Sequence, residues 1–322
     1  MKYKFIGFDG HYGGDEYERF FCKKLSGLSK NISLRRITAE RKGGFKSLIG
    51  LFKLILSAFI FKGRTIRPLG IPIIKYKMTV ILHHFDQKGS PFYTKLLERI
   101  DFFLLKLFSR LFKIKFITVS NYWSEWVKIN FKSDSYIIYN EVKVNFDNLK
   151  DRDYLSIKYN LKQDSSWVFL GSNQIKKGGK FVIDYLNENH EDIFDNKILI
   201  QSGVKKDSDS RSSVVIWIDE EDYFSFIKSC ELVVANSEFK EGWCRVLHEA
   251  ALLNVPIVGS GSGGMGELLE LVNGKSTYTL KEISDCICIK ELKSKSDVGS
   301  NKLNNLNLIS HTNLLNWING NN

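Results

Sequence analysis

The sequence predicts an α/β protein of two doubly wound, Rossmann-like domains that face each other across a cleft. Its 322 residues are about twice the usual size of one domain, so two domains of about 150 residues each are expected. Short runs of β-branched and aromatic residues alternate with helical patterns, as is typical of parallel sheets covered by helices. This alternation starts again after a polar stretch at residues 145–165.

In the first domain, expected to span residues 1–145, the segments with the composition of buried strands are residues 2–8, 78–84, 115–120 and 135–139. Residues 47–64 and 93–115 are helical in pattern and rich in Leu, Phe and basic residues. Neither predicts a membrane span, because a span needs about 20 nearly uncharged residues. Two interpretations stay open for them, buried domain helices or helices that lie at a membrane interface.

The second domain is expected at residues 146–300. Its strands are predicted at residues 167–172, 197–203, 213–218, 231–237 and 255–260. Polar residues 291–306 predict a loop, and residues 311–318 (HTNLLNWI) predict a short amphipathic helix. The tail, residues 301–322, is a candidate to pack back on the first domain.

Charge is distributed unevenly along the chain. Residues 1–150 hold 28 Lys and Arg against 12 Asp and Glu, whereas residues 151–322 hold 19 against 24, so the net charges are +16 and −5. The basic half suggests an anionic partner, such as nucleic acid, phosphorylated lipid or a membrane surface. Basic residues interleaved with stacking aromatics, which nucleic-acid binding would favour, are not evident.

The cysteines and the start of the chain indicate a cellular compartment. The five cysteines include no C-x-x-C pair, so neither a disulfide framework nor a zinc site is predicted. The chain opens with a short strand that leads into a glycine loop, which leaves no room for the hydrophobic region of a signal peptide. We therefore expect a cytoplasmic protein.

Residues 238–270 (EFKEGWCRVLHEAALLNVPIVGSGSGGMGELLE) are the most informative segment. A helix is predicted to begin near Trp243 or Cys244, where its exposed amides and dipole suit a diphosphate, and Gly242 allows close approach. Glu241 lies at this entrance, and Glu249 follows about two helical turns later. By spacing alone, an ordinary amphipathic helix with two solvated glutamates remains an alternative.

The segment resembles the donor-site signature of the family 4 (group 1) retaining glycosyltransferases, which have the GT-B fold. That signature is E-x7-E with EA at the second Glu, then P-V and a GG-x-x-E turn. The residues that match it are Glu241, Glu249, Ala250, Pro256, Gly263, Gly264 and Glu267.

The resemblance implies a role for each part of this segment. Glu241 would contact the donor sugar and Glu249 the ribose of the nucleotide, while amides near Trp243, Cys244 and Arg245 would meet the phosphates. Cys244 stands where the family often has Gly. Asn254 replaces the usual Gly before the strand, and Asn tolerates the left-handed conformation expected at that helix end.

A second match precedes the first along the chain. Residues 169–179 (FLGSNQIKKGG) resemble the family's G-R-x-x-x-x-K-G segment, in which Arg and Lys neutralise the diphosphate. Gly171 fills the first position, and Lys177 and Gly178 fill the last two. Ser172 occupies the Arg position, so one expected cation is missing, and Lys176 and Arg245 are both candidates to substitute for it.

Further segments resemble the family's active site. Residues 10–20 (GHYGGDEYERF) resemble its N-terminal glycine loop, in which amides near Gly13 and Gly14 would face the donor. His83 and His84 end a strand, at the sheet edge where open α/β folds bind ligands, and either could be the family's active-site histidine. Ile218 would lie near the nucleotide base.

The resemblance implies transfer of a hexose-type sugar, with retention of configuration, from a nucleotide diphosphate to a saccharide or lipid-diphosphate-linked acceptor. The bacterial surface-polysaccharide type is favoured, with a role in assembly of O-antigen, capsule or exopolysaccharide. No metal or other cofactor is expected, because helix amides and Lys177 would stabilise the leaving phosphate. Glu241 and one of the two histidines would form the catalytic centre.

The charge of the first domain suggests the partners and the location. Its net charge of +16 and its two helices rich in Phe, Leu and Lys would suit a lipid-diphosphate-linked acceptor, which favours a peripheral position on the inner face of the cytoplasmic membrane, against anionic lipid, with no nucleic acid bound. A catalytically degenerate protein that binds sugar nucleotide as the partner of another transferase is the alternative, motivated by Ser172.

Overall fold

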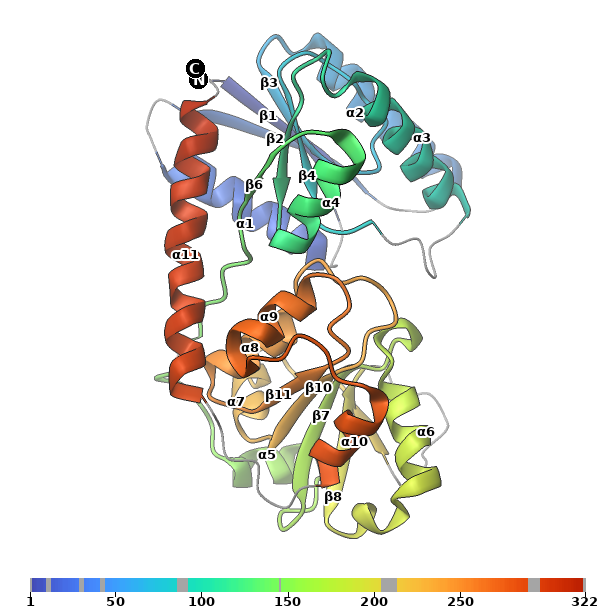
Figure 1. The fold of residues 1–322 in the computed structure, drawn as a ribbon, viewed down its shortest axis with the longest axis vertical. Helices are drawn as coiled ribbons and strands as arrows, with labels where there is room; N and C mark the ends of the chain where they lie inside the picture. Colours follow the sequence, from blue (N-terminus) through green and yellow to red (C-terminus); the bar gives the residue numbers. More distant parts are fainter. Residues whose placement is uncertain are drawn as a thin grey trace. The chain divides into compact units, whose positions relative to one another are not determined.

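The structure is a computed structural model that describes residues 2–9, 13–28, 32–40, 44–85, 92–144, 146–203, 213–288 and 296–320 (Figure 1). The chain forms two compact units, Met1–Glu141 with Ile309–Asn322 and Val142–Leu308. Each unit has a single parallel sheet with helices on both faces. The predicted α/β class with two doubly wound, Rossmann-like domains is confirmed.

The sheet of the first unit has the strand order β2-β1-β3-β4-β5-β6, and all neighbours are parallel. The chain therefore reverses its direction of travel across the sheet between β1 and β3. The strands are β1 (Lys2–Asp9), β2 (Ser33–Glu40), β3 (Arg64–Pro68), β4 (Met78–Leu82), β5 (Lys115–Thr118) and β6 (Ser135–Ile137).

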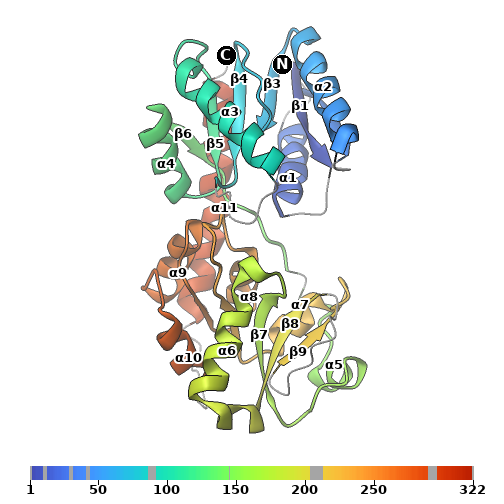
Figure 2. The same cartoon turned by 90° about the vertical axis from the view of Figure 1, so that its right-hand side faces the viewer.

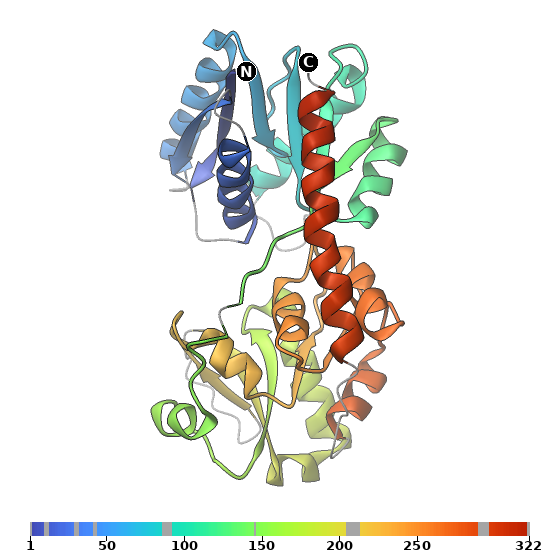
Figure 3. The same ribbon diagram turned by 90° about the vertical axis from the view of Figure 1, so that its left-hand side faces the viewer.

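Right-handed crossovers sort the helices of this unit onto two faces. Helices α2, α3 and α4 cover one face (Figure 2), and α1 covers the other together with the end of the C-terminal helix (Figure 3). The bounds are α1 (Gly13–Gly27), α2 (Gly44–Ile60), α3 (Phe92–Phe108) and α4 (Asn121–Phe131).

Strands β2 and β3 are absent from the sequence prediction, because charged residues interrupt their apolar pattern. Strand β3, with the sequence RTIRP, is nevertheless almost entirely buried. Arg67 and Asp101 of α3 are both fully buried, and their side chains form two parallel hydrogen bonds of 2.8 and 2.7 Å. The buried guanidinium thus has a counter-charge from a helix 34 residues away, which no local pattern reveals.

The C-terminal helix is much longer than predicted. Helix α11 (Ser296–Asn319) has 24 residues, so the expected loop at 291–306 is wrong from Ser296 onward, and residues 289–295 lie outside the described part of the chain. Trp317 near its end is fully buried and contacts the rings of Tyr3 and Phe21 at centroid distances of 5.5 and 5.9 Å. The indole of Trp317 donates a hydrogen bond to Thr79 Oγ1 at 3.3 Å, which ties the helix end to β4.

Helices α2 and α3 each carry two apolar stripes, one buried and one exposed. On α2, Leu51, Leu54 and Ala58 enter the core, and Leu97 of α3 packs against the same cluster. We call the exposed stripes together the α2/α3 apolar face. Its residues are Ile49, Phe52, Leu56, Phe59 and Ile60 on α2, and Phe92, Leu96, Ile100, Phe103 and Leu107 on α3.

These helices therefore have one buried side, as the first interpretation of the segments expects, and one side exposed to solvent. A position at a membrane interface stays a prediction. The residues of each exposed stripe recur at intervals of three or four, so they share one side of their helix. Searched over the described residues, no helix is both long enough and apolar enough to cross a membrane.

The sheet of the second unit has the order β11-β10-β7-β8-β9, again all parallel. The chain starts in the middle at β7, runs outward through β8 and β9, and returns to β10 on the other side of β7. The strands are β7 (Ser166–Ser172), β8 (Lys197–Ser202), β9 (Ser213–Ile216), β10 (Leu232–Ala235) and β11 (Ile257–Gly259).

Helices cover both faces of this second sheet. Helices α6 and α10 pack together over one face through a shared apolar core (Figure 2), and α7 contacts α8 over the other (Figure 3). The helices are α5 (Arg152–Lys158), η1 (Ile175–Lys177), α6 (Gly179–Asn189), η2 (Glu191–Asp195), α7 (Tyr223–Lys228), α8 (Arg245–Leu252), α9 (Gly264–Asn273) and α10 (Leu280–Cys288).

The buried ion pair leads to a first prediction. The substitution Asp101→Asn leaves the Arg67 guanidinium buried without its counter-charge, so we expect the free energy of unfolding to fall by about 3–5 kcal/mol in urea denaturation. Asp184→Asn is the matched control, because its pair with Lys180 is exposed, and it should cost less than about 0.5 kcal/mol. Equal losses in the two variants would contradict the assignment.

Candidate functional site

The candidate site lies in the second unit, where the order of strands reverses between β7 and β10. In open α/β sheets, ligands bind outside the carboxyl ends of the strands at this kind of position. The segment that follows β7 contains Lys177, and the segment that follows β10 contains Glu241. Two of the residues predicted from separate motifs thus come from neighbouring strands.

Lys177 and Glu241 form an ion pair of 2.7 Å. The Glu241 carboxylate is only 6% exposed, and it also accepts a hydrogen bond of 2.5 Å from Ser237 Oγ. Burial alone would lower the pKa of Lys177, but the Glu241 carboxylate outweighs it and raises that pKa above its usual value. The lysine therefore stays positively charged in a partly desolvated position.

Gly178 explains how Lys177 comes so close to β10. Its φ is +69°, and a Cβ at this position would lie 1.8 Å from the backbone oxygen of Asn236. The backbone after Lys177 thus lies directly against the segment that follows β10. A side chain at residue 178 would push these two segments apart.

The glycine pair at the start of α9 holds Glu241 from the other side. The amide of Glu241 donates to Ser262 O at 3.1 Å, and the amide of Gly264 donates to Glu241 O at 2.8 Å. Gly263 has a φ of +70°, and a Cβ there would lie 2.4 Å from Glu241 O. The glycine pair of the motif, Gly263 and Gly264, therefore contacts the backbone of Glu241 directly.

Helix α8 begins at Arg245 with Cys244 as its N-cap, close to the predicted start. Glu249 on this helix is 3% exposed, so the alternative of two solvated glutamates is wrong. Its carboxylate accepts hydrogen bonds of 2.8 Å from Tyr223 Oη and from Arg245 Nη2. Both partners fix the orientation of the carboxylate.

Tyr223 is a site residue that the sequence analysis missed. It lies 26 residues before Glu249, on α7, and no local pattern connects the two. Burial and the neighbouring Glu249 raise the pKa of Tyr223 well above its usual value. The hydroxyl therefore remains protonated and available as a donor.

Trp243 and His248 form a buried pair at the start of α8. The indole Nε1 donates to His248 Nδ1 at 3.0 Å. Burial, reinforced by the nearby Arg245, lowers the pKa of His248 to about 4, so the ring is neutral at pH 7 and its Nδ1 can accept this bond. The pair anchors the segment whose amides are predicted to meet phosphate.

Cys244 and Asn254 are the departures from the family pattern in this segment. Cys244 is 3% exposed, and burial raises its pKa to about 12, so it is an unreactive thiol rather than a nucleophile. Asn254 has a φ of +60°, which confirms the predicted left-handed conformation after α8.

Gly171 and Ser172 end strand β7. Gly171 has a φ of +73° with open space around its Cβ position, so its backbone conformation rather than crowding favours glycine. Ser172 Oγ accepts a hydrogen bond of 3.4 Å from the amide of Gln174. Gly242 is buried between Glu241 and Trp243.

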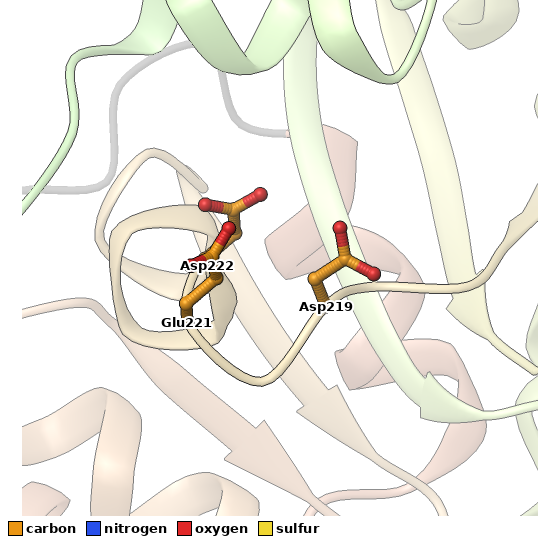
Figure 4. Close-up of side chains that lie close together, drawn as sticks. All are labelled: Asp219, Glu221 and Asp222. Carbon is orange, nitrogen blue, oxygen red and sulfur yellow. The ribbon is translucent and has the colours of Figure 1, made fainter.

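Three carboxylates gather in the segment between β9 and α7 (Figure 4). Lysine side chains already contact them: Asp222 accepts hydrogen bonds from Lys150 and Lys158. The hydrogen bonds from these lysines outweigh burial and lower the pKa of Asp222 to about 2. The cluster therefore fixes the segment that carries Ile218, which is buried, and leads into α7 with Tyr223. Its carboxylates are Asp219, Glu221 and Asp222.

An Asp-x-Asp pair is a pattern that can bind a divalent metal ion, and the sequence has two, at residues 151–153 and 207–209. Asp151 caps helix α5, where its carboxylate accepts a hydrogen bond of 2.7 Å from the amide of Tyr154. This aspartate therefore has a structural role. Residues 207–209 lie outside the described part of the chain.

The site residues predicted in the first unit lie at the carboxyl ends of its strands. His83 Nε2 is 3.3 Å from Glu18 Oε1, and its ring meets that of Tyr17 edge-on, with the centroids 4.9 Å apart. These contacts tie His83 to α1, and His84 is the more exposed of the two histidines. Gly13 and Gly14 begin α1, and residues 10–12 lie outside the described part of the chain.

Known structures share this architecture. The chain is similar to a sucrose-phosphate synthase from Thermosynechococcus elongatus, with a TM-score of 0.69 and 11% identity over 98% of this chain and 97% of that one. HepE from Anabaena, in complex with UDP-glucose, gives a TM-score of 0.69 and 16% identity over 99% and 100% of the two chains. WaaG, a glycosyltransferase involved in lipopolysaccharide biosynthesis, gives 0.64 and 10% over 96% and 95%.

These similarities establish the fold. The chain has the GT-B fold, as the sequence predicts. No protein-family model matches the sequence, and no curated protein matches it.

The close approach at Gly178 leads to a second prediction. Gly178→Ala adds a clash with the Asn236 backbone to the cost of a left-handed alanine, so we expect a loss of more than about 3 kcal/mol in the free energy of unfolding. Gly171→Ala is the control, because it carries only the conformational cost of about 1–2 kcal/mol. Equal losses in urea denaturation would show that the contact is not as described.

The pair of Trp243 and His248 leads to a third prediction. Because the folded-state pKa lies below that of the unfolded chain, the unfolded state binds more protons, and stability falls as the pH drops from about 6.5 towards 4. Between pH 7 and pH 5, the wild type should lose about 1–2 kcal/mol more than His248→Gln, which keeps an acceptor but does not titrate. Parallel pH profiles of the two proteins would exclude a neutral buried imidazole.

Proposed function

We propose that this protein is a retaining glycosyltransferase that transfers a hexose-type sugar from a nucleotide diphosphate to a saccharide or lipid-linked acceptor. The observation that carries the proposal is the ion pair of the half-buried Lys177 with the buried Glu241 at the carboxyl ends of β7 and β10, with Glu249 at 3% exposure on the adjoining helix. The proposed biological role is bacterial cell-surface polysaccharide assembly, of O-antigen, capsule or exopolysaccharide.

The charges of the site suit a sugar nucleotide. Lys177 supplies a positive charge for the diphosphate, and the first amides of α8 supply further donors along the helix dipole. Carboxylates accept hydrogen bonds from hydroxyls, so Glu241 suits the donor sugar and Glu249 the ribose. The similar structure of HepE is a complex with UDP-glucose, which supports a donor of the UDP-sugar type.

In the proposed reaction, the acceptor hydroxyl attacks the anomeric carbon on the face from which the diphosphate departs. The bond from that carbon to the phosphate oxygen breaks, and the departing oxygen takes the proton of the hydroxyl. Lys177 and the α8 amides stabilise the charge that develops on the phosphate, so no metal is required. Glu241 holds the sugar, and His84 or His83 lies on the acceptor side.

The proposed acceptor site belongs to the first unit, in a protein located in the cytoplasm at the inner face of its membrane. The α2/α3 apolar face exposes four phenylalanines among its ten residues. Lys53 on α2 and Arg99 and Lys106 on α3 are exposed on the same helices. Apolar side chains with adjacent cations suit an anionic bilayer surface that carries a lipid-linked acceptor.

Ser172 motivates a second candidate function, a protein that binds sugar nucleotide as the partner of another transferase without turning it over. One cation that the family uses is replaced by a neutral hydroxyl in this chain. Turnover therefore decides between the two functions.

A fourth prediction tests turnover. Thermal-shift screening of nucleotide sugars identifies the donor, and release of nucleoside diphosphate from that donor then measures the reaction. Glu241→Gln keeps the size of the side chain and removes its charge, so we expect release to fall about 100-fold. Glu188→Gln on the exposed side of α6 is the control and should leave it unchanged. Stabilisation by a donor without any turnover would favour the partner function.

A fifth prediction tests the membrane. Wild-type protein should co-sediment with vesicles that contain anionic phosphatidylglycerol, and Phe52→Glu combined with Phe103→Glu should weaken binding at least tenfold, because two exposed anchors are lost. Phe181→Glu, an exposed position on α6 in the second unit, is the matched control. Preference for neutral phosphatidylcholine vesicles would overturn the proposal.

A further inference from the structure

We propose that Lys176 is the second cation of the diphosphate site and does the work of the arginine that Ser172 replaces. This inference rests on the proposed function, because it names a further donor-binding residue of the same site. It concerns a residue that lies outside the matching motif positions. It rests on two lysine side chains that lie over one aromatic ring, and on the carboxylate that pairs with only one of them.

Lys176 and Lys177 both lie over the ring of Phe239. Their ammonium groups are 5.2 and 4.9 Å from its centroid. Phe239 is itself buried in the segment that follows β10, so the ring is a fixed support. A cation over an aromatic face is attracted by the ring quadrupole, which places the two ammonium groups in one region.

Of the two cations, only Lys177 forms an ion pair among the described residues, although the Glu241 charge also acts on Lys176 from a longer distance. Glu241 pairs with Lys177 at 2.7 Å. Among the residues that the structure describes, the Lys176 ammonium donates no hydrogen bond and forms no ion pair. Partial burial, and then the charge of Lys177, lower the pKa of Lys176. An anion bound between the two lysines would relieve this repulsion.

The competing candidate for the missing cation is Arg245. Its guanidinium donates to Glu249 at 2.8 Å, so this charge already serves the second carboxylate of the site. Ser172 itself offers a hydroxyl without charge. Lys176 is the cation that adjoins Lys177 in sequence and in space, on the strand-end segment that the matched motif uses for phosphate.

The experiment measures the dissociation constants of UDP and of inorganic pyrophosphate by calorimetry. We expect Lys176→Gln to weaken both ligands about tenfold, the loss of one charge-assisted contact. Lys176→Arg should restore affinity to within about threefold, because the positive charge is kept. Lys180→Gln, an exposed lysine paired with Asp184 on α6, should bind as the wild type does. Unchanged unfolding midpoints exclude a folding defect.

The outcomes separate this inference from the proposed function. Unchanged binding of both ligands to Lys176→Gln overturns the inference, and a loss in Arg245→Gln alone assigns the charge to Arg245. Pyrophosphate binding that depends on Lys176 supports the inference even if UDP does not bind. A wild type that no nucleotide sugar of the thermal-shift screen stabilises overturns the proposed function, and a wild type that binds neither UDP nor pyrophosphate overturns the inference.

Discussion

The ion pair between Lys177 and Glu241 is the interaction on which the candidate site depends. Each charge is partly or wholly removed from water, and each would be costly to bury alone. The pair exists because β7 and β10 are neighbours in the sheet although they are far apart in the sequence. Gly178 lets these two backbones approach closely enough for the side chains to meet, and Gly263 lets the turn before α9 lie against the backbone of Glu241.

A second layer of contacts supports the other carboxylate of the site. Asp222, held by two lysines, fixes the start of α7, and Tyr223 on that helix then donates to Glu249. Trp243 and His248 anchor the first turn of α8, the helix that carries Glu249. Site residues that touch ligand in the proposed reaction are therefore positioned by buried polar groups with satisfied partners, as a low-dielectric site requires.

The first unit uses its charges differently. Its deepest charged pair, Arg67 with Asp101, is fully enclosed and joins a strand to the helix that covers it. The outer sides of α2 and α3 leave ten large apolar side chains in contact with solvent. An exposed apolar area of this size promotes aggregation unless another surface covers it, so contact with a partner surface would explain it.

The sequence by itself determined the class of the fold and most of its strands, because buried parallel strands carry near-continuous apolar runs. It also indicated Glu241 and Glu249 by their spacing at a helix start, and the resemblance to a known family added Lys177. Strand β2 escaped it because charged residues interrupt its apolar pattern, and β3 because the burial of Arg67 depends on an aspartate supplied by another element.

Only the tertiary structure decided which residues of the site meet. The pairing of Lys177 with Glu241, the hydrogen bond from Tyr223 to Glu249, and the position of two lysines over the Phe239 ring depend on contacts between segments that are distant in the chain. The sequence also did not predict the length of α11, because its first half is polar and resembles a loop. In the structure that half belongs to one helix, which Trp317 anchors at its other end. Local patterns report what a segment buries, whereas the partner that makes burial favourable comes from elsewhere in the fold.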